Sequence, residues 1–339
     1  MLFDIMIWYT LFNWSNKVMD MSKLLKKLSV IVAGTSFFSI TGTTVAEAIS
    51  IAPRNNGQDL ASEILGSGIT IMPGSVNYIG ATGASGFFQN GIKSGIGIDE
   101  GIILSTGLAK NAVGPNNLSK RSTVNGLSGD PDLGALIPGV STSDANILEF
   151  QFKTAGGNIF FNYVFASEEY NQYVGSAFND VFGFFLNGKN IALIPNTSTP
   201  VAINTVNGGN PFGTNGSNPE FFNNNDGERF NISFDGFTDV FTAQAFGLDA
   251  GVHNIKLAIA DGGDSSLDSA VFIQGKTFSA QTTKYVPEPS ADPAVFISEN
   301  TFSDQPTNKL TKHVPEPSAM IGLLVTSLGS FFFKKVYKV

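Results

Sequence analysis

Apolar and polar residues alternate along several stretches in the middle of this 339-residue chain. In residues 147–153 (ILEFQFK), Leu148, Phe150 and Phe152 point to one face of an extended strand, and the polar residues between them point to the other. Residues 253–260 (HNIKLAIA) alternate in the same way. This period of two predicts strands with one buried face, and it restricts the middle of the chain to an all-β fold.

Turn signals separate further strand candidates. These candidates lie at residues 101–106, 158–166, 180–188, 190–194, 237–246 and 270–275. Asn-Gly, Gly-Gly and Asp-Gly pairs, which favour tight turns, stand at 187–188, 208–209, 226–227 and 235–236. Phenylalanine on both faces of 158–166 and 180–188 predicts central strands that are covered on each side. Together these features predict an antiparallel β-sandwich of jelly-roll type.

One short helix is expected to open the domain. Asp59 is expected to cap it, Leu60, Ile64 and Leu65 to form its apolar face, and Gly66 to end it.

The composition excludes several classes of protein. The chain has no cysteine, which rules out disulfides, cysteine-ligated zinc and iron–sulfur clusters. Its only histidines are His253 and His313, too few for a three-histidine zinc site. Residues 49–311 carry 12 basic and 24 acidic side chains. This acidic excess argues against nucleic acid and anionic lipid as partners, and it is compatible with divalent cations.

The N-terminal region predicts an export signal over residues 21–48. Lys23, Lys26 and Lys27 form a basic segment, residues 28–40 form an apolar one, and Ala46 and Ala48 fit the small-residue rule for signal peptidase. A transmembrane anchor is the alternative, but the apolar stretch is short for one. Residues 1–20 precede the signal and are interpreted as a wrongly assigned start.

The last 26 residues, 314–339, combine three parts in order. The Pro315-Glu316-Pro317 motif comes first, an apolar run of 15 residues follows at 319–333, and a lysine-rich tail ends the chain. This arrangement resembles the PEP-CTERM sorting signal of Gram-negative bacteria. The resemblance implies processing by a membrane exosortase and an association with exopolysaccharide and biofilm matrix. A plain single-pass anchor is the alternative.

A second copy of the motif lies upstream of this signal. Val286-Pro287-Glu288-Pro289-Ser290 has the same sequence as residues 314–318, but a polar segment follows it. Because that segment cannot partition into a membrane, this copy is interpreted as degenerate. Residues 278–313 are therefore predicted to be a polar spacer.

The body of the chain, residues 57–277, resembles the choice-of-anchor L domain. The resemblance rests on LASEILGSGITI, GIILSTG, GDPDL, YVFASEEYNQYVGSAFNDVFGFFLNG and DSAVFIQG. Members of that family are surface proteins with alternative C-terminal anchors, which implies export to the cell envelope or matrix. The family has no established catalytic residues.

An acidic group follows or precedes the strongest strands. Its members are Glu168, Glu169, Asp180, Asp261, Asp264 and Asp268. Loops at the edges of a sandwich can converge, so the hypothesis is that either glutamate and the four aspartates bind one Ca²⁺, which favours oxygen ligands in flexible loops. Solvated acidic turns are the alternative. Asp130 and Asp132 are interpreted as a turn.

Three functions are weighed. The favoured one is an exported, non-enzymatic protein of the envelope or exopolysaccharide matrix with a structural or adhesive role. The alternative is calcium-dependent binding of extracellular polysaccharide, with Tyr163, Tyr170 and Tyr173 as aromatic platforms and the Asn-rich loop around residues 223–225 as a source of amides. The third is a glycan-active enzyme that pairs Glu168 or Glu169 with Asp180.

Overall fold

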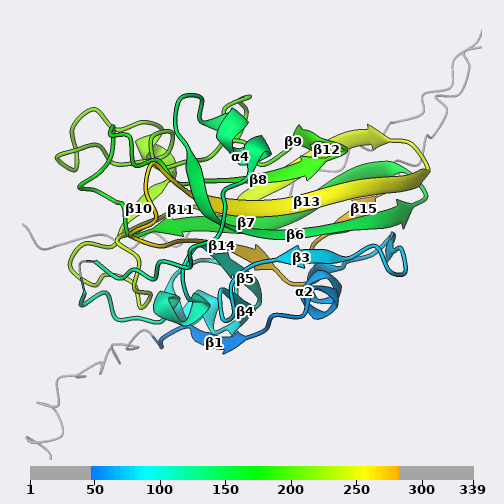
Figure 1. The fold of residues 1–339 in the computed structure, drawn as a ribbon, viewed down its shortest axis with the longest axis horizontal. Coiled ribbons are helices and arrows are strands. Elements are labelled where there is room, and N and C mark those ends of the chain that lie inside the picture. The colour runs from blue at the N-terminus through cyan, green and yellow to red at the C-terminus, as the bar shows by residue number, and fades with distance from the viewer. Residues whose placement is uncertain (1–46, 119, 282–339) are drawn as a thin grey trace, which may run out of the picture. The chain divides into compact units, whose positions relative to one another are not determined.

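The computed structural model describes residues 47–118 and 120–281, and Figure 1 shows them as two β-sheets packed face to face. The larger sheet has nine strands in the order β1 (Ser50–Pro53), β4 (Ser85–Gln89), β5 (Gly101–Ser105), β14 (Ser269–Gln274), β7 (Gly157–Ser167), β11 (Gly236–Thr238) and β10 (Phe222–Asn224), with β12 (Phe241–Leu248) and β15 (Ser279–Gln281) also paired to β7. The smaller sheet has six strands in the order β2 (Ile69–Ile71), β6 (Thr142–Thr154), β13 (Gly251–Gly262), β8 (Val181–Leu186) and β9 (Lys189–Asn190), with β3 (Asn77–Ile79) on β6.

All named strand pairs in the described residues are antiparallel. This confirms the all-β sandwich that the alternation predicted. Short helices lie between the strands: α2 (Gly57–Ile64), α3 (Gly91–Ser94), α4 (Pro131–Leu136), and the 3₁₀ turns η1 (Ala109–Ala112) and η2 (Pro219–Phe221). No helix in the described ranges has both the length and the apolar character needed to cross a bilayer.

The main core lies between the two sheets and is largely aromatic. The inward-facing residues of β6 and β13 meet those of β7 and β14, as the period of two requires. Phe161 of β7 packs on Phe184 of β8 with 4.8 Å between ring centroids. Aromatic pairs of this kind add packing energy beyond the area they bury, and they replace the disulfides that the chain lacks.

The outer faces of the central strands are also covered. Val164 and Ala166 of β7 pack into a second cluster with residues such as Phe237. Val181 and Phe185 of β8 pack into a third cluster beneath α4. The prediction that both phenylalanine-rich strands are buried on two sides is confirmed.

The opening helix differs in detail from the sequence expectation. Asn56 is its N-cap, and the Asn56 side chain accepts a hydrogen bond from the Asp59 backbone N–H at 3.1 Å. Asp59, expected to be the cap, lies instead in the first turn, where its charge favours the helix dipole. The apolar face is confirmed, because Leu60 and Ile64 are buried.

Three other local expectations are corrected. Strand β9 covers only Lys189–Asn190, so most of residues 190–194 is not strand. The stretch 237–246 divides between β11 and β12. The pair Asp235-Gly236 is not a turn, because Gly236 begins β11 and is buried. The Asn187-Gly188 turn is confirmed, with φ values of 50° and 81°.

The sheets extend past residues 57–277 at both ends. Strand β1 precedes that range, and Phe278 with β15 follows it, so the first residues of the expected spacer belong to the larger sheet. Ala48 lies in the described part, two residues before β1 begins. The interpretations of residues 1–20, of residues 21–46 with Ala46, and of the sorting signal at 314–339 lie outside the described residues.

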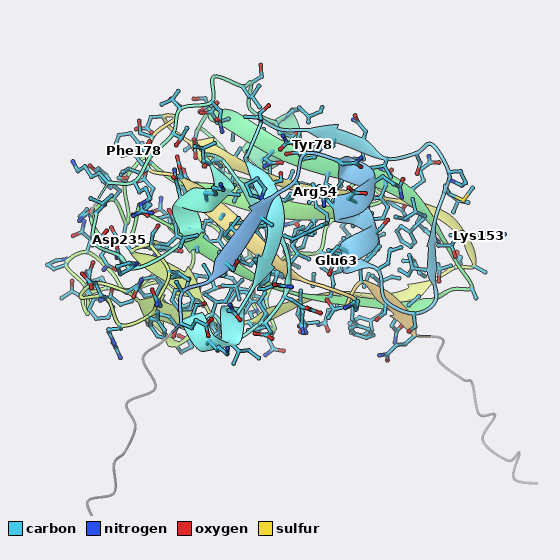
Figure 2. All side chains as sticks on the ribbon, turned by 90° about the horizontal axis from the view of Figure 1, so that it is seen from below. Arg54, Glu63, Tyr78, Lys153, Phe178 and Asp235 are labelled. Carbon is cyan, nitrogen blue, oxygen red and sulfur yellow. The ribbon has the colours of Figure 1, made fainter. Side chains whose placement is uncertain are left out.

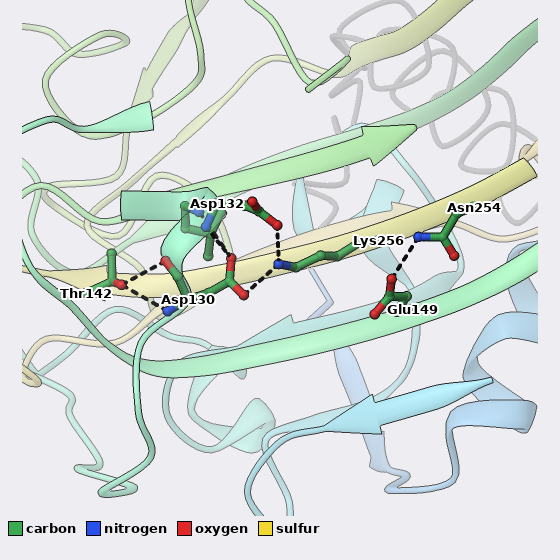
Figure 3. A network of polar contacts seen from close by, with 7 residues as sticks. Asp130, Asp132, Thr142, Glu149, Asn254 and Lys256 are labelled. Atoms are coloured by element: carbon green, nitrogen blue, oxygen red, sulfur yellow. Dashed lines mark hydrogen bonds and ion pairs between the residues drawn. The ribbon is translucent and has the colours of Figure 1, made fainter. Parts of the chain in front are cut away.

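A buried ion pair ties α4 to the smaller sheet (Figure 3). Lys256 of β13 donates to Asp130 at 2.6 Å and to Asp132 at 2.7 Å. Asp130 is the N-cap of α4 and accepts from two backbone N–H groups of the helix. The interpretation of Asp130 and Asp132 as a turn is therefore corrected: they form a capped helix start.

Removing the Lys256 charge should destabilise the domain. In Lys256→Met the aliphatic stem is kept, but Asp130 is left without its counter-charge. We expect the free energy of unfolding in urea to fall by about 1–3 kcal/mol, less than for a fully buried pair because Asp132 is exposed. Lys276→Met is the matched control, because its pair with Glu100 is solvent-exposed. Equal effects of the two substitutions would contradict this account.

Candidate functional site: two buried carboxylate clusters

The acidic residues singled out in the sequence gather at one end of the sandwich. Strands β7 and β13 end there, while β8 and β14 begin there. In Figure 2, Phe178 and Asp235 mark this end, and Lys153 marks the opposite one. The loops at these strand ends therefore converge at one end of the sandwich.

Asp180 and Asp261 face each other across neighbouring strands. The register of β8 and β13 pairs Val181 with Ala260, so the residues one step further are Asp180 and Asp261. Both side chains are at most 1% exposed. Two like charges in directly opposed positions are destabilising unless a proton or a cation lies between them.

The two carboxylates differ in their hydrogen bonds. Asp180 accepts from the Gly262 backbone N–H at 2.9 Å and from the Ser269 hydroxyl at 2.6 Å. Neither oxygen of Asp261 has a hydrogen-bond partner among the described residues. Ser143, opposite Asp261 on β6, donates its hydroxyl to the Asp264 carbonyl instead. A buried carboxylate with no donor is an unusual and costly arrangement.

Glu169 and Asp264 complete what we call the Asp261 cluster: Glu169, Asp180, Asp261 and Asp264. Glu169 is buried, and its Oε2 atom lacks a partner in the described structure. Glu169 and Asp264 line a hollow of about 320 Å³ that opens to solvent beside Tyr173 and Phe178. The cluster therefore has an entry path for a small ion.

The glycines beside this cluster allow a close approach of the backbone. A Cβ atom on Gly262 would lie 2.3 Å from the carbonyl oxygen of Asn179. Gly263 adopts a φ of +100° against the backbone of Ala177.

Glu168 points away from its neighbour Glu169. Its Oε1 atom lies 2.9 Å from the Ser233 hydroxyl oxygen, and its charge interacts with Asp235. Glu168 and Glu169 are adjacent residues of an extended segment, so their side chains point in opposite directions. The sequence predicted one ion site that used either glutamate, but the structure places the two glutamates in two separate clusters.

Asp268 has a different environment. Its carboxylate accepts from the Thr123 backbone N–H at 2.7 Å and from the Asn111 amide at 2.9 Å, so both oxygens are occupied. Asp144 is similarly held by the N–H groups of Asn125 and Leu127. These two aspartates fix the loop that precedes α4.

Burial raises the pKa of most carboxyls at this end. It raises the pKa of Glu169 to about 9, helped by the charges of Asp180 and Asp264. It raises the pKa of Glu168 to about 8, with the charge of Asp235 adding to the effect. Burial also raises the pKa of both Asp180 and Asp261. The Thr106 hydroxyl opposes the shift at Asp261 without completing a hydrogen bond to either oxygen.

No preformed metal site is present in the described ranges: no three Asp, Glu or His side chains already surround one point. A cation at the Asp261 cluster would therefore need two carboxylates supplemented by other oxygens, or a closure of the side chains. Calcium accepts amide and carbonyl oxygens beside carboxylates and tolerates irregular geometry.

The aromatic platforms expected for carbohydrate are mostly unavailable. Tyr163 and Tyr170 are fully buried in the main core, because β7 and the segment after it face the other sheet. Only Tyr173 reaches the surface, where it packs edge-on against Phe178. The acid/base pair that combined Glu168 with Asp180 spans two different clusters.

Sequence reasoning missed Asp235 and Asn171. The pair Asp235-Gly236 predicted a turn, so Asp235 was not considered as a site residue, but Gly236 is the first residue of β11. Nothing in the sequence around Asn171 distinguishes it from other loop amides. Their placement depends on which strands pair.

The comparisons with known proteins identify one family. The family model named Choice-of-anchor L domain matches residues 50–279. No curated protein and no solved structure matches the chain.

The raised pKa values predict how metal-free stability depends on pH. A carboxyl whose pKa is higher in the folded state than its unfolded value near 4 adds stability that is complete below about pH 4 and is lost as the pH rises through the folded pKa. With EDTA present, we therefore expect a lower melting temperature at pH 8 than at pH 5.

The double variant Glu169→Gln, Asp261→Asn should weaken this pH dependence, because the neutral amides do not titrate. Differential scanning calorimetry at both pH values provides the measurement. A metal-free melting temperature that rises from pH 5 to pH 8, by the same amount in both proteins, would contradict the prediction.

Proposed function

This chain belongs to the choice-of-anchor L domain family, and we propose that it is a structural or adhesive protein of the cell envelope or exopolysaccharide matrix whose loop-bearing end binds calcium. Family membership makes it a surface-anchored or exported protein. The structural or adhesive role, the calcium and the sorting route belong to the proposal.

The observation that carries the calcium proposal is Asp261. This carboxylate is 1% exposed and faces Asp180 across the ladder, yet it completes no hydrogen bond in the described residues, and only the Thr106 hydroxyl nearby favours its charged form. A buried carboxylate can be neutralised by a proton, a basic side chain or a cation. None of the ion pairs found in the described residues involves the Asp261 cluster.

The proton and the cation remain, and the position of the cluster favours the cation. Glu169 and Asp264, whose charges interact with Asp180, line a solvent-accessible hollow, and Lys120 also lines it without forming an ion pair. Glu169 and Asp264 supply carboxylate oxygens there, as hard divalent cations require. Extracellular modules bind calcium with dissociation constants of about 10⁻⁴–10⁻³ M, which loosely assembled sites of this kind can reach.

Calcium would then restrict the motion of the loops at the loop-bearing end of the domain. The loops that carry Glu169, Asp180 and Asp264 leave different strands, so one ion that joins them restricts all three. Surface loops carry most binding specificity, and fixing them in advance lowers the entropy cost of binding a partner. This supports a structural or adhesive role in which recognition depends on calcium.

Sorting is the second part of the proposal. The segment 314–339 resembles a PEP-CTERM signal, and signal peptidase and an exosortase-type membrane enzyme are its implied partners. The apolar run would hold the protein in the inner membrane, transiently or permanently, while the lysine tail stays in the cytoplasm. A chain delivered in this way reaches the envelope, where extracellular polysaccharide is the available partner.

Calcium should raise the thermal stability of the full chain. A ligand that binds only the folded state at a hundredfold excess over its Kd adds about 2.7 kcal/mol, or about 5–10 °C in melting temperature for a domain of this size. We expect this shift when Ca²⁺ replaces EDTA, and we expect Asp261→Asn to reduce it.

Asp249→Asn is the matched control, since Asp249 is exposed in the turn between β12 and β13 at the opposite end. It should retain the full shift. If millimolar Ca²⁺ leaves the wild-type melting temperature unchanged, the calcium proposal fails.

The sorting proposal is tested with the two copies of the motif. Replacing Pro315, Glu316 and Pro317 with alanine should leave the protein in the inner-membrane fraction with its C-terminal segment attached. The same replacement in the upstream copy, residues 287–289, should not alter its distribution. Fractionation and mass determination of the C-terminus provide the readout, and identical behaviour of both variants would contradict the proposal.

A further inference from the structure

Three buried oxygen atoms without hydrogen-bond partners belong to the segment that follows β7 and to the residue that precedes β11. They are Glu168 Oε2, Asp235 Oδ2 and Asn171 Oδ1, and the described structure supplies no hydrogen-bond donor to any of them. Their residues are 1%, 3% and 7% exposed. We call Glu168, Asn171, Asp226 and Asp235 the Asp235 cluster.

The sheet register brings the two carboxylates of this cluster together. Strand β11 pairs with β7 so that Gly236 lies opposite Ser167. One residue further, Asp235 lies opposite Glu168, in the same relation as Asp180 and Asp261 on the smaller sheet. The domain therefore buries a second pair of opposed carboxylates, contributed by different strands.

Each carboxylate has one oxygen oriented by a donor and one left free. Asn116 donates its amide to Asp235 Oδ1 at 2.8 Å, which leaves Oδ2 without a partner. Ser233 contacts Glu168 Oε1, which leaves Oε2 without one. Metal-binding carboxylates are oriented in this manner, with one oxygen held by the protein and the other directed to the ion.

The Ser233 hydroxyl cannot fully neutralise Glu168. Its oxygen lies within hydrogen-bond distance of both the Asn111 carbonyl and Glu168 Oε1, and it has one proton to donate. The charge of Arg121 acts on Glu168, but its Nη1 atom donates to the carbonyls of Asn111 and Val113. It forms none of the ion pairs found in the described ranges.

Asn171 is linked to this cluster through Asp226, whose charge acts on Asp235, and it offers a neutral oxygen. Its amide nitrogen donates to Asn224 Oδ1 at 2.9 Å and to Asp226 Oδ2 at 2.8 Å. The amide orientation is thus determined by its two donor bonds, and the buried Oδ1 atom has no donor to accept from. One neutral amide oxygen beside two carboxylate oxygens is a ligand set that suits calcium.

The cluster opens to solvent through a second hollow, of about 370 Å³. Asn116, Asp226, Glu228 and Asp235 are among its lining residues. This acidic mouth attracts cations, and it is lined by residues other than those around the Asp261 cluster.

We propose that the Asp235 cluster is a second divalent-cation site, in which Glu168 Oε2, Asp235 Oδ2 and Asn171 Oδ1 bind Ca²⁺. The site joins the end of β7, the start of β11 and the loop after β10. It is independent of the calcium proposed for the Asp261 cluster, because the two sites share no ligand.

The test counts ions bound to the full chain. The protein, purified in mild detergent, is dialysed against Ca²⁺, and bound calcium per chain is measured by elemental mass spectrometry. We expect two ions for the wild type, one for Glu168→Gln with Asp235→Asn, and one for Glu169→Gln with Asp261→Asn. The single variant Asp235→Asn should bind the second ion at least tenfold more weakly.

The outcomes separate the two sites. If the wild type binds one ion and only the variant with Glu168→Gln and Asp235→Asn loses it, the Asp235 cluster is a calcium site and the Asp261 cluster is not. If the variant with Glu168→Gln and Asp235→Asn binds as many calcium ions as the wild type, the inference is overturned. Without metal, we expect that variant to melt at or above the wild-type temperature, because two buried acidic groups are replaced by neutral amides. Such a result excludes a folding defect as the cause of ion loss.

Discussion

The packing of two aromatic-rich sheets against each other is the interaction on which the rest of this structure depends. With no cysteine in the chain, burial of side chains such as Phe161, Tyr163 and Phe184 between the sheets must provide most of the stability. The central strands are covered on their outer faces as well. The result is an interior of low polarity that continues to the ends of the strands.

The acidic clusters arise where this interior meets the loops. Strands β7, β8, β11, β13 and β14 end or begin at the same rim, and the residue at each of these positions is next to an acidic one in the sequence. Two cross-strand carboxylate pairs are thereby enclosed in surroundings that disfavour charge. Elsewhere the chain balances a buried carboxylate directly, as Lys256 does for Asp130. At this rim none of the ion pairs found in the described residues involves a carboxylate of either cluster, although the charge of Arg121 acts on Glu168, and the two calcium proposals rest on this difference.

Many features of the fold followed from sequence pattern, because the residues that decide them are neighbours in the chain. Alternation in residues 147–153 and 253–260 predicted β6 and β13, and Asn187-Gly188 predicted the turn after β8. The errors arose where tertiary pairing overrode a local signal. Asp235-Gly236 resembles a turn, yet pairing with β7 makes it the start of a strand. Tyr170 lies in a polar loop sequence, yet its ring is buried against Phe222.

The sequence alone determined that the chain forms an antiparallel sandwich, that residues 49–311 are acidic, and that carboxylates adjoin its strongest strands. These properties depend on composition and on spacings of a few residues. Only the tertiary structure decided that Glu168 and Glu169 serve different clusters, that Asp268 is held by hydrogen bonds, and that Asp235 lies opposite Glu168. The reason is physical: these contacts join segments as much as 145 residues apart in the chain, and the pairing and register of the strands determine which of them meet.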